Sequence, residues 1–394
     1  MKRLKPYIKT IHLWLGLASG LVVFIVALSG SVLVFEKELG PFFDPAYYNV
    51  PQVSSERFPA DHLIEQARNR HPDSEFTNLY VFDEPERSML IHLTDKNGER
   101  LVLSADPYSG AILKDTFYEK RFFFIVTELH RYLLMGNTGK AITGASCLIF
   151  VVLLISGIVL WCPVKLKNLK PRLKIKWNAS FKRVNWDIHS VFGFYSSVFL
   201  LLIALTGLIW SYRWYENLMY YIADGASKPV HRVKNISAKN ATERKDYFYA
   251  SMLRETDSLF PYHGDIRLIR DVKGVNSILV LKENLEAGIP NIRDMVYFDM
   301  YSGKRLKTTL YKDLSTGDKV RRLVYPIHIG SIYGYPTKIL AFLVCLVAAS
   351  SPITGFLIWR GRKKKTKPGR KSKRKEEKPE RQKNERLLQK QEVL

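Results

Sequence analysis

Four histidines in this sequence stand beside long apolar segments, where an imidazole could bind a metal. His12 and His189 begin two such segments. His130 and His328 each precede another segment by eleven residues. A single histidine at a membrane edge is more often an interfacial hydrogen-bonding group. Four at matching positions favour a cofactor site, because two imidazoles facing each other across a helix bundle suit the axial positions of a haem iron.

The apolar segments have the length and composition of transmembrane helices. A helix needs about 20 residues to cross a hydrocarbon core of roughly 30 Å, and it satisfies its backbone hydrogen bonds internally. The sequence therefore predicts an α-helical membrane protein with four transmembrane helices. The windows with almost no charge are Ile11–Phe35, Ala141–Cys162, Val191–Tyr212 and Ile339–Trp359.

Most of the net charge of +24 lies in three basic segments beside these windows. Residues 1–11 hold four Lys or Arg and no acid; residues 163–188 hold eight against one Asp, and residues 360–394 sixteen against five Glu. Short basic segments stay cytoplasmic, so we expect both termini and the middle loop inside, and residues 36–140 and 213–338 outside. Topology thus explains the charge without a nucleic-acid partner. The tail is expected to be disordered and to contact membrane lipid.

The chain repeats itself. A shift of 177 residues aligns His12 with His189, and a shift of 198 residues aligns His130 with His328. A Ser-Gly or Thr-Gly pair recurs in every window and permits close approach of a helix or of a flat macrocycle. We therefore expect two span–domain–span repeats. Their parts are residues 1–35 (N-terminus and first span), 36–129 (first outer domain), 130–162 (second span with its histidine segment), 163–188 (basic loop), 189–212 (third span), 213–327 (second outer domain), 328–359 (fourth span with its histidine segment) and 360–394 (basic tail).

Each outer segment has the pattern of a small α+β domain. A helix-like stretch precedes strand-like runs such as "TNLYVF" and "NSILVLKE", and Asn97-Gly98 between alternating runs indicates a hairpin. "ADPYSGAIL" in the first segment matches "FDMYSGKRL" in the second. We therefore expect two small extracytoplasmic domains, each with one helix on an antiparallel sheet. Neither carries a catalytic constellation, which favours binding or scaffolding.

The topology pairs the histidines by membrane face, with His12 and His189 at the cytoplasmic edge and His130 and His328 at the external edge. We expect each pair to hold one haem iron. No C-x-x-C-H motif occurs, so both haems would be b-type. Pairs on opposite faces do not make one tetrahedral zinc site. A copper or iron site with two histidines stays open as an alternative.

Cationic side chains near the outer pair are candidates for the haem propionates. Arg131 follows His130, and Arg322 lies shortly before His328. Further candidates are Arg321, Lys140 and Lys338. The alternative is that these long side chains only extend into the membrane interface.

The span motifs resemble the PepSY-associated transmembrane helix family. The first span opens with "HLWLGL"; "ELHRYLLMGNTGKAITG" leads into a second that ends "SGIVLWCP"; "WDIHSVFG" opens the third, and "HIGSIYG" leads into a fourth that ends "TGFLIW". The resemblance covers residues 1 to about 360, and the D-x-Y-S-G segments are similar to PepSY domains. It implies a bacterial inner-membrane protein linked to iron acquisition. Family members include haem-containing reductases of ferric siderophores, and by resemblance the four histidines occupy the haem-ligand positions.

These observations favour a di-haem b oxidoreductase that passes electrons across the membrane to a ferric siderophore or another ferric chelate. No Rossmann G-x-G-x-x-G element follows a strand, so quinol or a separate reductase would supply the electrons. The second hypothesis is a non-catalytic membrane anchor whose PepSY-like domains bind a peptide, a protease or a transporter partner. Secondary transport is a third, but the spans lack the internal acids that transporters use.

Overall fold

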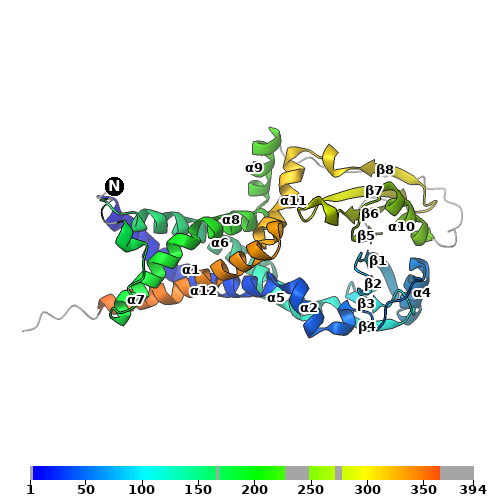
Figure 1. Ribbon diagram of the computed structural model, residues 1–394, viewed down its shortest axis with the longest axis horizontal. Coiled ribbons are helices and arrows are strands. Elements are labelled where there is room, and N and C mark those ends of the chain that lie inside the picture. Colours follow the sequence, from blue (N-terminus) through cyan, green and yellow to red (C-terminus); the bar gives the residue numbers. More distant parts are fainter. Residues whose placement is uncertain (1–2, 166, 168, 227–247, 271–276, 364–394) are drawn as a thin grey trace, which may run out of the picture.

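The computed structural model describes residues 3–165, 167, 169–226, 248–270 and 277–363. Figure 1 shows two parts, a bundle of long helices and an antiparallel sheet at one end of it. We call the end of the bundle next to the sheet the sheet side and the opposite end the far side. The tail after Lys363, expected to be disordered, lies outside the described residues.

Four helices of the bundle are long and apolar enough to cross a membrane, as the sequence predicts. The third span begins with the short helix α7 (Phe181–Asp187) and a π-helical turn, Ile188–Phe192. Helices α1 and α8 each pack against both α6 and α12, which closes the bundle. The bounds are α1 (Lys5–Leu33), α6 (Gly136–Trp161), α8 (Gly193–Ser211) and α12 (Tyr335–Lys363).

His130 and His328 lie on separate helices that precede α6 and α12. His130 is near the end of α5 (Phe122–Tyr132), and His328 is the last residue of α11 (Thr316–His328). After α5 the chain turns through Leu133, which has φ of 50°. After α11 it turns through Gly330, where a Cβ atom would lie 2.5 Å from the carbonyl oxygen of Thr337, so only glycine fits. These turns separate the two histidines from the spans that follow.

The two outer segments form one eight-stranded sheet in the order β4-β3-β2-β1-β5-β6-β7-β8. The expectation of two separate domains is therefore corrected, because β1 and β5 pair antiparallel, with Tyr80 opposite Arg267. Two separate four-stranded sheets would each leave an unpaired edge there, and the pairing removes both. The bounds are β1 (Ser74–Val81), β2 (Met89–Asp95), β3 (Arg100–Ala105), β4 (Ile112–Phe117), β5 (Ile266–Ile269), β6 (Ser277–Glu283), β7 (Arg293–Asp299) and β8 (Arg305–Thr309).

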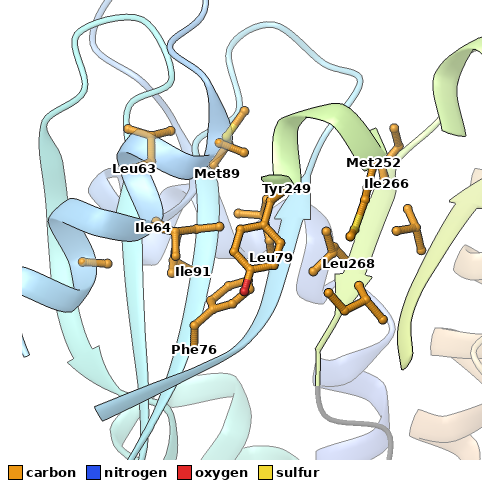
Figure 2. Close-up of a cluster of buried hydrophobic side chains, with 14 of the residues drawn as sticks. Leu63, Ile64, Phe76, Leu79, Met89, Ile91, Tyr249, Met252, Ile266 and Leu268 are labelled. Atoms are coloured by element: carbon orange, nitrogen blue, oxygen red, sulfur yellow. The ribbon is translucent and has the colours of Figure 1, made fainter. Parts of the chain in front are cut away.

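One helix from each segment covers the side of the sheet that faces away from the bundle: α4 (Ala60–Arg70) and α10 (Phe248–Leu259). Figure 2 shows the apolar core between these helices and the strands, where Leu63 and Ile64 of α4 and Met252 of α10 meet Leu79 and Leu268. Burying each such side chain contributes roughly 1.5–3 kcal/mol. The core joins the strands of both segments.

The other side of the sheet faces the bundle. Tyr47 and Tyr48 of α3 (Pro45–Tyr48) pack on Leu90 and Val102 there. The connecting helices are α2 (Glu36–Phe43) and α9 (Arg213–Asp224).

The D-x-Y-S-G segments are hairpin turns. In the first, the carboxylate of Asp106 accepts hydrogen bonds from the backbone N–H of Tyr108 and the hydroxyl of Ser109. Asp299 does the same for Tyr301 and Ser302. Each turn leads into an edge strand, β4 or β8, which the sequence pattern does not predict because neither strand shows a regular alternation of apolar and polar residues.

Candidate functional site

The four histidines form two couples, one at each end of the bundle. On the sheet side, the ring centres of His130 and His328 lie 6.2 Å apart, with an angle of 66° between the rings. On the far side, His12 and His189 lie within electrostatic reach of each other. We call these the sheet-side couple and the far-side couple. Each couple takes one histidine from residues 1–162 and one from residues 181–361, which we call the two halves.

The couples are separated by most of the length of a span. The Nδ1 atom of His130 lies 3.3 Å from the hydroxyl of Ser29, which is on the same helix as His12. Seventeen residues of α1 separate His12 from Ser29, or about 26 Å at 1.5 Å per residue. The same number of residues separates His189 from Thr206, which contacts His328. The two sites therefore lie near opposite ends of the helices.

Each imidazole is held by the Ser-Gly or Thr-Gly pair of the other span in its own half. Oxygen–nitrogen distances to Nδ1 are 2.8 Å from Ser156 to His12 and 2.8 Å from Thr354 to His189. On the sheet side, Thr206 lies 3.0 Å from Nδ1 of His328. The repeated small pairs are therefore histidine cradles, a role beyond the close packing that the sequence indicates.

The hydrogen bonds fix which ring nitrogen carries the proton. Nδ1 of His130 lies 2.9 Å from the carbonyl oxygen of Val26, and Nδ1 of His328 lies 2.9 Å from that of Ile203. A carbonyl oxygen only accepts, so Nδ1–H must donate in both rings. The hydroxyl of Thr354 donates its one proton to its own helix and therefore accepts from His189.

The hydroxyl of Ser156 likewise donates to the carbonyl oxygen of Leu153, so it accepts from His12. In each neutral ring the lone pair is then on Nε2. None of the four Nε2 atoms makes a hydrogen bond within the described residues. This is the state in which a histidine binds a metal, with its other nitrogen oriented by a second group.

The glycine of each pair makes room for the ring. A Cβ atom on Gly30 would lie 2.9 Å from Cε1 of His130, which is closer than real contacts allow. The corresponding distances are 3.3 Å for Gly207 to His328, 3.4 Å for Gly355 to His189 and 3.5 Å for Gly157 to His12. The hydroxyl thus orients each ring, and the missing side chain next to it lets the ring approach the helix.

The sheet-side couple has the spacing of two imidazoles on one metal. Metal–nitrogen bonds of about 2 Å on opposite sides of an ion put the ring centres roughly 6 Å apart. Both residues are partly exposed. Across the described ranges, no three His, Cys, Asp or Glu side chains gather as a metal site. The residues present fit a haem with two histidine ligands.

Two local features distinguish the second half. His189 lies on the π-helical turn Ile188–Phe192, a rare distortion often found at functional sites. The ring of Trp210 contacts the ring of His328, with 5.1 Å between centres, and Arg321 lies over the same indole at 5.6 Å. The sequence pattern predicts neither the π-helical turn nor the ring contact.

The candidate cations for the propionates lie in different surroundings. Arg131 is exposed over the ring of Tyr132. Arg322 donates to the sulfur atom of Met295 on the sheet, at 3.4 Å. Two other candidate cations are partly neutralised: Arg321 pairs with Glu216 at 2.8 Å, and Lys338 pairs with Glu38 at 2.7 Å. The structure thus brings the four histidines together as two couples and directs Arg322 toward the sheet.

Four helices able to cross a membrane and a separate antiparallel sheet domain define a multi-pass membrane protein. The sequence profile of the PepSY-associated TM region matches residues 9–362. The chain therefore belongs to the PepSY-associated transmembrane family. No curated protein matches the chain.

Proposed function

We propose that this protein is a di-haem b oxidoreductase of the bacterial inner membrane. It would pass electrons across the membrane and reduce a ferric chelate, such as a ferric siderophore, on the sheet side. The observation that carries the proposal is the pair of histidine couples, each with its Nδ1 atoms engaged and its Nε2 atoms left for a metal.

The protein's part is to hold and orient the ligands. His130 and His328 would hold one haem, and His12 and His189 the other. Haem with two histidine ligands takes up and releases one electron at a time, at a potential set by its ligands and burial. Donation from Nδ1–H to a hydroxyl or carbonyl oxygen raises the basicity of Nε2 and keeps each ring in one orientation.

The basic segments support the direction of transfer. The N-terminus and the loop after α6 lie on the far side, and both are rich in Lys and Arg. Basic segments remain cytoplasmic, so the sheet domain would lie in the periplasm. We also infer that the chain arose as two span–domain–span repeats with PepSY-like outer parts, since the two halves supply equivalent cradles and strands.

The substrates follow from the chemistry. One electron converts each ferric ion to iron(II), which binds hard oxygen donors less tightly and is released. Quinol or a separate reductase would donate the electrons on the far side, because no Rossmann G-x-G-x-x-G motif is present in the sequence.

The absorption spectrum of the detergent-purified protein, oxidised and then reduced with dithionite, tests the proposal. We expect a b-type spectrum and about two haems per chain, one for each couple. The reduced protein should be reoxidised by a ferric chelate under argon, with iron(II) trapped by a coloured ligand. A folded, colourless preparation from haem-supplemented cells would refute the proposal and favour a non-catalytic anchor.

A further inference from the structure

We propose that the bundle-facing side of the sheet binds a negatively charged chelate between Arg267 of β5 and Arg322 of α11. The site deepens the proposed function, on which the identity of the ligand as a ferric chelate rests. Its location and charge preference rest on the register of the sheet and on the contacts of the two arginines.

The register of the sheet puts the two guanidinium groups beside one row of residues. Tyr80, Arg267, Leu281 and Met295 lie opposite one another on β1, β5, β6 and β7. Ile266 and Leu268 belong to the core under α10, so Arg267 between them projects to the other side. Arg322 reaches the same row at Met295. Two strand spacings, roughly 10 Å, separate the backbones of Arg267 and Met295.

Neither arginine forms a close ion pair with a carboxylate within the described ranges, although Asp318 and Asp294 lie within electrostatic reach of Arg322. Arg267 donates one long hydrogen bond, of 3.3 Å, to the side-chain oxygen of Asn78. Its Nε atom is buried and has no hydrogen-bond partner in the part of the chain that the structure describes. Arg322 bonds only weakly, to sulfur, and burial lowers its pKa. A buried guanidinium group without an acceptor costs free energy unless a ligand supplies one.

Two other arginines on the bundle-facing side of the sheet form close ion pairs. Arg293 forms an ion pair with Glu283 at 3.0 Å, and Arg100 forms one with Glu119 at 2.7 Å. A further arginine, Arg121, lies within electrostatic reach of the carboxylate of Glu36 and donates to the hydroxyl of Tyr48. Arg267 and Arg322 thus lack the close carboxylate contact that Arg293 and Arg100 have.

Aromatic groups line the same region. The guanidinium group of Arg267 lies 4.7 Å from the centre of the Tyr80 ring, and Tyr80 in turn contacts His92, at 5.2 Å between ring centres. Tyr297 lies within electrostatic reach of Arg322. Guanidinium groups bind carboxylate oxygens in a bidentate way, and phenol rings pack on flat chelating groups. The chemistry fits an anionic chelate with carboxylate or catecholate oxygens and disfavours a cationic one.

The site lies next to the sheet-side couple. Tyr325 is three residues before His328 on α11, and it lies within electrostatic reach of Glu36 and Arg293 of the sheet side. Tyr325 is 49 % exposed, so its ring is accessible to a ligand. A chelate in contact with Tyr325 would be close to His328.

Binding of a gallium(III) chelate tests the site apart from any reduction, because gallium(III) is not reduced to gallium(II). We would titrate the full-length protein in detergent with the gallium(III)–EDTA anion and with a cationic gallium(III) trihydroxamate, by calorimetry. We expect the anion to bind, and Arg267→Gln or Arg322→Gln to weaken it more than about 10-fold, as for loss of a charge-assisted contact. Arg254→Gln is the matched control, since Arg254 is exposed on α10 on the other side of the sheet.

Arg267→Lys and Arg322→Lys guard against misfolding, because they keep the charge and should bind the anion more tightly than the glutamine variants. Equal affinity for the anionic and cationic chelates, or wild-type affinity in both glutamine variants, would overturn the site. Since gallium binding needs no haem, a colourless protein would refute the oxidoreductase and still leave this site measurable.

Discussion

His130 and His328 come from different halves of the chain, yet their ring centres lie 6.2 Å apart. Each ring is held by its own half, His130 by Val26 and Ser29 and His328 by Ile203 and Thr206. The orientation of each ligand is therefore set locally, whereas the distance between the ligands depends on how the halves dock. A cofactor shared by the couple would link the two halves.

Replacing one histidine of each couple should separate the two haems. We expect His12→Ala and His130→Ala each to remove about one haem per chain, because in the proposed function each couple would supply both ligands of one iron. Haem would be quantified against protein after purification. His263→Ala is the control, since that side chain is 80 % exposed on the sheet domain. Loss of both haems from either single variant would contradict independent couples.

The cradle hydroxyls should matter most where no carbonyl group can replace them. The Nδ1–H of His12 donates to Ser156, whereas that of His130 has the carbonyl oxygen of Val26 as well as Ser29. Ser156→Ala should weaken haem binding about 10–100-fold, the usual effect of losing a group that orients a metal ligand.

Ser29→Ala should have a smaller effect, and Ser156→Thr should restore binding because threonine keeps the hydroxyl. Haem dissociation rates and reduction potentials of the two sites are the measurements. Equal losses in Ser156→Ala and Ser29→Ala would show that the hydroxyls act through helix packing alone.

A side chain added at a cradle glycine should clash with the histidine ring, and Gly193 offers a matched control. A Cβ atom on Gly30 would lie 2.9 Å from Cε1 of His130, whereas one on Gly193 would meet nothing within 4 Å. Gly30→Ala should displace the ring and remove haem from the sheet-side couple. Gly193→Ala should keep both haems and raise stability by up to about 1 kcal/mol, since alanine favours a helix. Full haem retention in Gly30→Ala would contradict a tight cradle.

The spans could be predicted from the sequence because each is an uninterrupted apolar run. In lipid such a run must form a helix to satisfy its backbone hydrogen bonds. The hairpin at Asn97-Gly98 is equally local, and Gly98 indeed has φ of 82°. The single eight-stranded sheet could not be predicted, because the pairing of β1 with β5 joins residues almost 190 positions apart. No local pattern records which edges meet.

The histidine cradles are visible in the sequence as recurring Ser-Gly and Thr-Gly pairs, but that pattern has two readings. Ser-Gly and Thr-Gly pairs are typical of helix packing, and only the contacts of their glycines with the four histidines reveal the second role. The useful clue is the spacing: seventeen residues separate histidine and hydroxyl in the first and third spans. The direction of Arg322 toward Met295 could not be predicted, because it depends on where the sheet docks.

Acid should destabilise the sheet domain through His92. Burial, with Arg267, Arg121 and Arg100 nearby, lowers the pKa of His92 to about 3, against 6.5 in the unfolded chain. Below pH 6.5 the unfolded state binds a proton that the folded state does not, so stability falls as the pH falls toward 3. The loss is about 1.4 kcal/mol per pH unit, or roughly 2 kcal/mol at pH 5.

His92→Gln removes this proton from both states, so its thermal midpoint should fall less between pH 7.5 and pH 5 than that of the wild type. Circular dichroism of the full-length protein in detergent would follow the transition. A parallel loss of stability in His92→Gln and the wild type would contradict the lowered pKa of His92.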